Sequence, residues 1–456
     1  MRTGFVIRII FCLSTALFLA STTTADDAPT YSLTSSRRAG SIDRLEIAVE
    51  VAGTLQIDQP DRNESAPMRV AANLIYEERT LDVPAHQGIP FRSVRYYEKA
   101  AARVQAGEVS FVPVLRAERG VVVVHVQDGK PTVFSPQGPL TRDELELVDP
   151  LGNSLLLDQL LPEGPVRVGQ KWKHSPETLA AILGLEQITS AAVTSELTEV
   201  KEGVARLEMQ GRLTGRDKGA TATVTLRAKY WFDLELRRIT WFGLLLQENR
   251  GAGLVEKPFQ AVARLQMKIT PLHEPKHLSD SLLEGLTLEP DTPLLLLEHR
   301  STAGGWQLVN DRRWFVISDE RDRAVLVLVE DQKRLAQCHV ASARGGQPPE
   351  RVSLADFQRD VQKALGKHFG GFVEASQAVN QRGYRLYRLV VQGVVDGVPI
   401  HWIYYLVASK EGQQVVVAFI VEAEHLGAFG HSDRELIEAI QLEGADKPGT
   451  HSSAAP

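Results

Sequence analysis

The chain has 456 residues, of which 43% are hydrophobic and 24% are charged, and this length predicts two or three domains with ordinary hydrophobic cores. Its 51 Lys and Arg are outnumbered by 57 Asp and Glu, which gives a net charge of −6. Because nucleic acids and anionic membrane surfaces require a basic face, this balance disfavours both as partners.

The first 25 residues have the layout of a secretory signal peptide. Arg2 and Arg8 form a basic start, residues 9–20 are mostly apolar, and small residues lead to Ala25, where we expect cleavage. The apolar run is short for a membrane span, and retention as an uncleaved anchor is the alternative. We therefore expect an exported protein, periplasmic or extracellular, with no transmembrane segment after cleavage. Cys338 would be its only cysteine, which excludes an intrachain disulfide.

Residues 26–40 are polar and predict a flexible segment, and residues 41–272 predict an antiparallel sheet domain. Apolar and polar residues alternate along several stretches, which is typical of half-buried strands. The predicted strands include 42–58, 68–78, 121–126, 190–201, 203–214, 219–233 and 236–249, with a last one through 262–269. Such a sheet has one apolar face that another layer must cover.

A helical insertion at 141–184 is the predicted cover. Thr141 and Glu144 form a capping-box pattern, and leucines between 155 and 161 make an apolar stripe. Ser175, Pro176 and Gly184 have the positions expected for the cap, the first turn and the end of a further helix.

Residues 273–292 are rich in proline and charge and predict a linker, residues 293–442 predict a second domain, and residues 443–456 predict a disordered tail. Asp396-Gly397 predicts a two-residue hairpin turn that pairs Val391 with Trp402 and Leu389 with Tyr404. Both faces of 400–407 are apolar or aromatic, so both require a cover. Helices predicted at 353–369 and 432–441, capped by Ser353 and Ser432, would make an α/β/α sandwich with an antiparallel sheet.

The stretch HEPKH at 273–277 matches the zinc-protease signature H-E-x-x-H. That signature needs both histidines on one face of a helix. Pro271 and Pro275 disfavour a helix here, so we predict a turn and a helix that starts near Pro275 or Ser279. No metal site, cofactor or catalytic residue is predicted, since serine-hydrolase, phosphate-loop and dinucleotide motifs are absent from the sequence.

Two resemblances accompany this pattern. The segments SLADFQRDVQKAL, GYRLYRLVVQGVVDGVPIHWIYYLV and SDRELIEAIQL resemble the PsbP-like α/β/α fold over about 300–442, whose members are generally binding or assembly modules. GPLTRDEL and LLPEGPVRVGQKW, at the edges of the cover, resemble exported lipid carriers of the LolA and LppX type and exported bacterial domains of unknown function. The second resemblance implies a curved sheet closed by helices over an apolar cavity.

The predicted fold is therefore α+β: a curved antiparallel sheet, or half-barrel, with a helical cover, followed by an α/β/α sandwich. We expect a non-enzymatic exported bacterial protein that binds an apolar or lipid-like ligand in its first domain and a protein partner in its second. The predicted cavity lining is Leu156, Leu160, Trp172, Leu179, Ile182, Tyr230 and Trp241. The alternatives are an envelope assembly factor with solid cores and no small ligand, and a hydrolase whose site no motif reveals.

Overall fold

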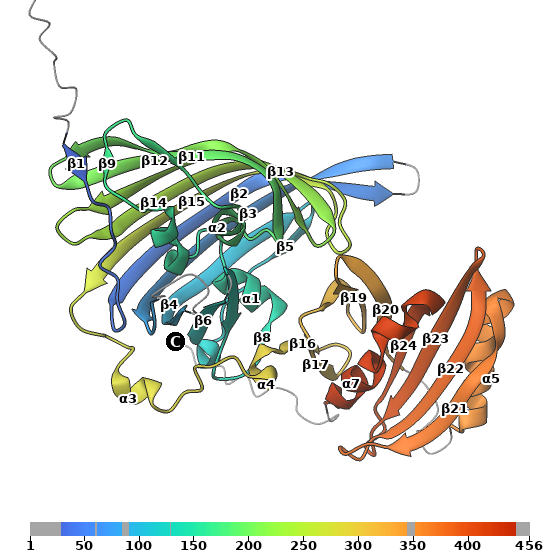
Figure 1. The fold of residues 1–456 in the computed structure, drawn as a ribbon. Helices are drawn as coiled ribbons and strands as arrows, with labels where there is room; N and C mark the ends of the chain where they lie inside the picture. The colour runs from blue at the N-terminus through green and yellow to red at the C-terminus, as the bar shows by residue number, and fades with distance from the viewer. Residues whose placement is uncertain (1–28, 60–61, 84–90, 128, 344–351, 444–456) are drawn as a thin grey trace, which may run out of the picture.

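The computed structural model describes residues 29–59, 62–83, 91–127, 129–343 and 352–443 (Figure 1). The expected signal peptide and nearly all of the expected tail lie outside these residues. Strands make up 57% of the structure and helices 16%, so the chain is β-rich, with several mostly antiparallel sheets that all stay open in the described part. No helix in the described ranges combines the length and apolarity needed to cross a membrane.

The largest sheet has twelve antiparallel strands and curves around a helical cover (Figure 1). Its eleven consecutive neighbours are β10 (Lys171–Lys173), β11 (Gln187–Lys201), β12 (Val204–Asp217), β13 (Ala220–Asp233), β14 (Arg238–Arg250), β15 (Phe259–Leu272), β2 (Ile42–Gln59), β3 (Arg62–Thr80), β4 (Phe91–Ala106), β6 (Val121–Gln127) and β7 (Lys130–Phe134). The short β5 (Val109–Phe111) pairs with β4, and the 3-10 helix η1 (Ala117–Arg119) precedes β6. The strands predicted between 190 and 249 are confirmed within three residues.

Buried and exposed side chains alternate along the strands, and this alternation defines the two faces of the sheet. Along β13, Tyr230 and Phe232 are buried, while Arg227, Lys229 and Trp231 are exposed. We call the covered side the inner face and the opposite side the outer face.

The cover consists of α1 (Arg142–Val148), the 3-10 helix η2 (Ser154–Leu160) and α2 (Pro176–Leu183), beside a two-stranded sheet of β1 (Thr30–Tyr31) and β9 (Val166–Arg167). The predicted caps are confirmed. Thr141 and Glu144 form a reciprocal capping box on α1, and Ser175 accepts a hydrogen bond from the Thr178 N–H of α2. Gly184 ends α2 with φ 64°, a left-handed conformation that glycine adopts without steric cost.

A second antiparallel sheet follows further along the chain. Its strand order is β18 (Trp314–Glu320), β19 (Arg323–Glu330), β20 (Lys333–Ser342), β24 (Gln414–Glu422), β23 (Val398–Ala408), β22 (Arg385–Val395) and β21 (Phe369–Val379). The predicted register across Asp396-Gly397 is confirmed: Val391 faces Trp402 and Leu389 faces Tyr404.

Helices pack on both faces of this second sheet. The side chains Phe357, Val361 and Leu365 of α5 (Leu354–Leu365) share a core with Trp402. On the other face, α6 (Leu426–Phe429) and α7 (Ser432–Ala439) share a core with Phe419. The predicted Ser432 cap is wrong: Ser432 is the first residue of α7, and its hydroxyl donates to the Phe429 carbonyl instead.

Short elements connect the two large sheets. A four-stranded sheet has the order β25 (Gln441–Leu442), β17 (Trp306–Asn310), β16 (Leu297–Ser301) and β8 (Leu140–Thr141), so the start of the cover pairs with residues from much later in the chain. The segment predicted as a linker contains α3 (Asp280–Leu283), and α4 (Thr292–Leu295) begins at its last residue. Two further 3-10 helices, η3 (Gly366–His368) and η4 (Ala423–His425), complete the described elements.

Candidate functional site between the large sheet and its cover

Six of the seven side chains predicted to line a cavity lie together beneath the cover. Leu156, Leu160, Leu179, Ile182 and Tyr230 are at most 1% exposed and belong to one hydrophobic core, against which Trp172 packs. Leu156, Leu160 and Tyr230 have no exposed surface at all, so no water-sized space lies beside them. The interface between sheet and cover is therefore closely packed at these residues.

Trp241 is not part of this group. In β14, Phe242, Leu244 and Leu246 point to the inner face and are buried, so the alternation of the strand directs Trp241 to the outer face. There its ring packs against Trp231 with a centroid distance of 4.8 Å. The placement of Trp241 in the predicted cavity is a correction to the sequence analysis, which found the strand but not which of its faces is covered.

A chain of hydrogen bonds runs through this interface. The Trp172 indole N–H and the Tyr230 hydroxyl both donate to the Leu160 carbonyl, at 3.0 and 3.2 Å. The Tyr230 hydroxyl also lies 2.9 Å from the Ser195 Oγ, which in turn lies 2.7 Å from the His174 Nε2. The chain links η2 and the strands β10, β11 and β13, and it satisfies polar groups that would otherwise be buried without partners.

The pair of Ser195 and His174 has the spacing that nucleophilic catalysis requires. However, Ser195 is fully buried, which leaves no room for a substrate next to its Oγ. Burial also lowers the pKa of His174 to about 4, so the ring is neutral at pH 7. The hydrogen bond between Ser195 and His174 therefore helps to pack the cover against the sheet.

Charged residues also anchor the cover to the sheet, at Asn153 and Ser154. The Arg95 guanidinium, from β4, donates to the Glu78 carboxylate of β3 at 2.7 Å and to the Asn153 side chain at 2.6 Å. Ser154 donates to the other Glu78 oxygen at 2.8 Å. Burial alone would raise the pKa of Glu78, but the charges of Arg95 and Arg37 outweigh it and hold this pKa below its usual value. Glu78 is therefore ionised inside the protein.

Arg37 extends this buried network to the segment before β2. Its guanidinium lies 3.1 Å from the Asp158 carboxylate of η2 and 3.7 Å from Glu78. Arg238, at the start of β14, pairs with Asp43 of β2. Three arginines thus face three carboxylates, Asp43, Glu78 and Asp158, and their opposite charges hold the sheet, the cover and the preceding segment together.

The cover leaves one end of the inner face open. A row of cross-strand neighbours passes from Leu246 through Ala263, Val51, Val70 and Val104 to Phe111, and every member is apolar. Along it the exposed fraction rises from 4% at Leu246 to 43% at Phe111. In the next row, Met68 and Ala106 lead to Val109, which is 64% exposed.

We call Val51, Val70, Val104, Val109 and Phe111 the apolar strip. The chain continues from it into Val112 and Val114, which are 58% and 54% exposed. The alternating strand patterns did not predict this site, although the run VSFVPVL at 109–115 is a conspicuously apolar stretch of the sequence. Contiguous exposed apolar surface of this kind marks binding sites in soluble proteins.

The HEPKH stretch forms a turn, as predicted. Residues 273–279 are not helical, and α3 begins at Asp280 with Ser279 as its N-cap. The Glu77 carboxylate of β3 accepts hydrogen bonds from the backbone N–H groups of Lys276, His277 and Leu278. The His277 ring stacks on Tyr96, so this stretch closes the end of the sheet.

Comparisons with known proteins show a fold-level likeness only. Neither a protein-family model nor a curated protein sequence matches the chain. Among solved structures, PsbP of Synechocystis sp. PCC 6803 is similar, with 14% identity, a TM-score of 0.26, and coverage of 32% of this chain and 92% of PsbP. The Saccharomyces cerevisiae Ran-binding protein Mog1p has 11% identity, a TM-score of 0.26, and coverage of 33% and 96%. Lipovitellin has 10% identity, a TM-score of 0.32, and coverage of 53% and 26%.

Proposed function

We propose that the chain is an exported, non-enzymatic bacterial protein that binds an apolar or lipid-like chain along the apolar strip. The observation that carries this proposal is the all-apolar row from Leu246 to Phe111, which begins in the buried core and ends at the surface. An acyl chain laid along this row would remove apolar surface from water without burying a charge. The ligand site therefore moves from beneath the cover, as the sequence predicted it, to the end that the cover leaves open.

We further propose that residues 293–442 form a PsbP-like α/β/α module for protein association, and β21 supports this second function. It is the edge strand of its sheet, and Val373 and Val379 on it are 57% and 68% exposed. An exposed edge strand offers backbone hydrogen bonds to a strand of a partner. An assembly factor with solid cores would use this edge alone and leave the apolar strip without a ligand.

Binding of a fluorescent fatty acid such as cis-parinaric acid tests the apolar strip. We expect the double substitution Val109→Ser and Phe111→Ser to weaken binding at least about tenfold, because each lost apolar contact removes about 1 kcal/mol or more. Both side chains are exposed in the protein without ligand, so its stability should change little.

The matched control is Val168→Ser with Leu236→Ser. These side chains are 51% and 47% exposed and lie outside the apolar strip, so the control removes apolar surface of the same kind. It should leave the affinity within about twofold. Equal losses in the two double variants would show that the fatty acid binds without using the strip.

A further inference from the structure

The outer face of β12–β15 is strongly basic in a chain whose net charge is −6. The outward positions of these four strands hold two acidic residues, Glu208 and, at the end of β13, Asp233. Their basic residues are Arg206, Arg212, Arg216, Arg227, Lys229, Arg264 and Lys268, all of them exposed. Lys229 pairs with Glu208 at 2.8 Å, whereas Arg227, Arg264 and Lys268 have no ion pair with any described residue. On the neighbouring strand β2, the exposed Glu50 and Glu46 lie opposite Arg264 and Lys268 in register, without forming ion pairs with them.

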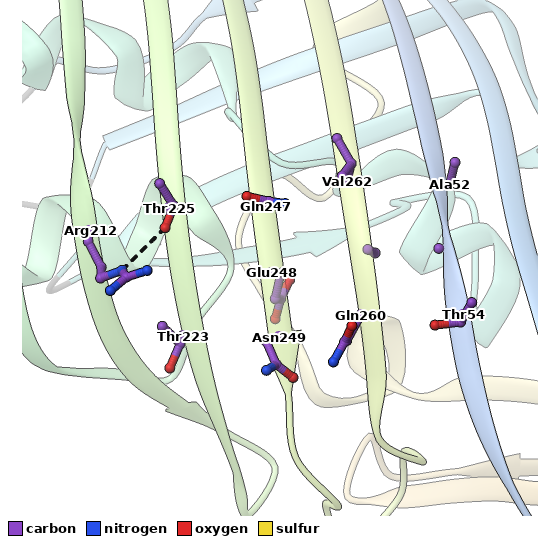
Figure 2. A pocket seen from close by; sticks show the side chains of 12 residues that line it. Ala52, Thr54, Arg212, Thr223, Thr225, Gln247, Glu248, Asn249, Gln260 and Val262 are labelled. Atoms are coloured by element: carbon purple, nitrogen blue, oxygen red, sulfur yellow. Dashed lines mark hydrogen bonds between the residues drawn. The ribbon is translucent and has the colours of Figure 1, made fainter. Parts of the chain in front are cut away.

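Two depressions lie side by side on this face. The first, of 540 Å³, is lined mainly by amides, hydroxyls and one guanidinium group: Thr54, Arg212, Thr223, Thr225, Gln247, Asn249 and Gln260 (Figure 2). Ala52, Gly53, Ala261, Val262 and Glu248 complete its lining, and the Glu248 carboxylate accepts a hydrogen bond from Arg250. The second, of 480 Å³, is lined by Arg227, Lys229, Trp241, Leu245, Arg264 and Gln266, among others. The two meet along β14, where Leu245 and Gln247 are successive outward residues.

A tryptophan platform borders the second depression. A Cβ added to Gly243 would lie only 2.4 Å from the Trp241 ring, so the absence of a side chain there lets the indole lie flat on the sheet. Trp231 packs against this ring at 4.8 Å and is itself 41% exposed. A broad aromatic surface thus stays in water, although burying an aromatic side chain is favourable.

We propose that this outer face binds an acidic polysaccharide. Indole faces pack against the C–H surfaces of sugar rings, and the amides and hydroxyls of the first depression match sugar hydroxyls as donors and acceptors. The guanidinium groups of Arg227 and Arg264 suit the acidic groups of such a polymer, since they bind carboxylates in a bidentate manner. The proposal concerns the face opposite the apolar strip and does not depend on it.

Two other anionic partners fit the same face less well. Nucleic-acid contacts go mostly to phosphates, whereas the lining of the first depression holds one cation, Arg212, one acidic residue, Glu248, and otherwise uncharged groups. An anionic bilayer would desolvate Gln247, Asn249 and Gln260 without offering each a partner. A polymer that carries both hydroxyl and acidic groups can form hydrogen bonds in the first depression and ion pairs with the arginines of the second.

Affinity electrophoresis of the full chain in gels that contain polygalacturonate or heparin tests this proposal, with neutral dextran as the reference polymer. We expect retardation in at least one acidic gel and a dissociation constant that rises about tenfold for Trp231→Ala and for Arg227→Ser with Arg264→Ser. The matched control is Arg69→Ser with Arg103→Ser, two exposed outer-face arginines on β3 and β4, which should stay within about twofold.

The outcomes separate the alternatives. Retardation that Trp231→Ala leaves unchanged and that both arginine pairs reduce equally would be charge attraction without a site, and would overturn the proposal. So would tighter binding of duplex DNA or of phosphatidylglycerol vesicles than of both acidic polysaccharides, or equal mobility in all gels. Thermal melting of each variant shows whether a lost affinity reflects a lost fold.

Discussion

Replacing Arg95 with methionine is expected to lower the free energy of unfolding by about 3–5 kcal/mol. Arg95 is 1% exposed and donates to Glu78 and to Asn153, so it joins β3 and β4 to the cover. Methionine keeps much of the volume but removes the charge, which leaves the ionised Glu78 carboxylate buried with fewer partners. The change can be measured as the shift of the denaturation midpoint in guanidinium chloride.

Two comparisons make this result specific to the buried pair. Arg103→Met lies on the same strand at an exposed outer-face position and should change stability by no more than about 0.5 kcal/mol. Adding Glu78→Gln to Arg95→Met removes the uncompensated charge and should restore a substantial part of the loss. A loss below about 1 kcal/mol for Arg95→Met alone would mean that the network does not hold the cover in place.

The second large effect is the loss of stability in mild acid caused by His174. Burial lowers the pKa of this ring to about 4 in the folded protein, against an ordinary value of 6.5. Between these values the unfolded chain binds the proton more tightly than the folded chain does. The contribution of His174 is therefore complete above pH 6.5 and is lost as the pH falls toward 4. We expect this loss to be about 2–3 kcal/mol.

Stability curves of the wild type and of His174→Gln between pH 7 and pH 4 measure this contribution. The stability advantage of the wild type should shrink by about 2–3 kcal/mol over that range, because glutamine does not titrate. His273→Gln is the control, since His273 lies in an exposed turn. Parallel curves for the wild type and His174→Gln would contradict the buried, neutral state of the ring.

Patterns formed by residues close together in the sequence predicted much of the fold. The Asp396-Gly397 turn determined the register of β22 and β23, because both residues adopt the positive φ that a two-residue hairpin needs, at 49° and 85°. The caps of α1 and α2 followed in the same way from side chains within three residues of the backbone groups they satisfy. Each of these predictions depends on neighbours in the sequence.

Features that depend on contacts between residues far apart in the sequence could not be predicted. The buried network joins Arg37, Asp43, Glu78, Asp158 and Arg238, and no local pattern indicates that these residues meet. The same holds for the pair of His174, which follows β10, and Ser195, which lies in β11. Charged residues on a strand predict a solvated face, so the burial of Arg95 and Glu78 contradicts the usual expectation.

The candidate site, like the fold, could be predicted only in part. Leucine spacing correctly grouped Leu156, Leu160, Leu179 and Ile182 under one cover, but it could not indicate whether space remains between them. Alternation along β14 separated Trp241 from Phe242 without revealing which one faces the cover. The apolar strip depends on where the cover ends, which is a property of the folded chain.

Native mass spectrometry of the protein purified gently from its native source, followed by organic extraction, tests the proposed function most directly. Our account predicts an added mass that extraction releases as a lipid-like compound, and its loss when Val109 and Phe111 are replaced with serine. A ligand-free mass for both the wild type and this variant would contradict the account. The search would then turn to protein partners of residues 293–442, beginning with the exposed edge of β21.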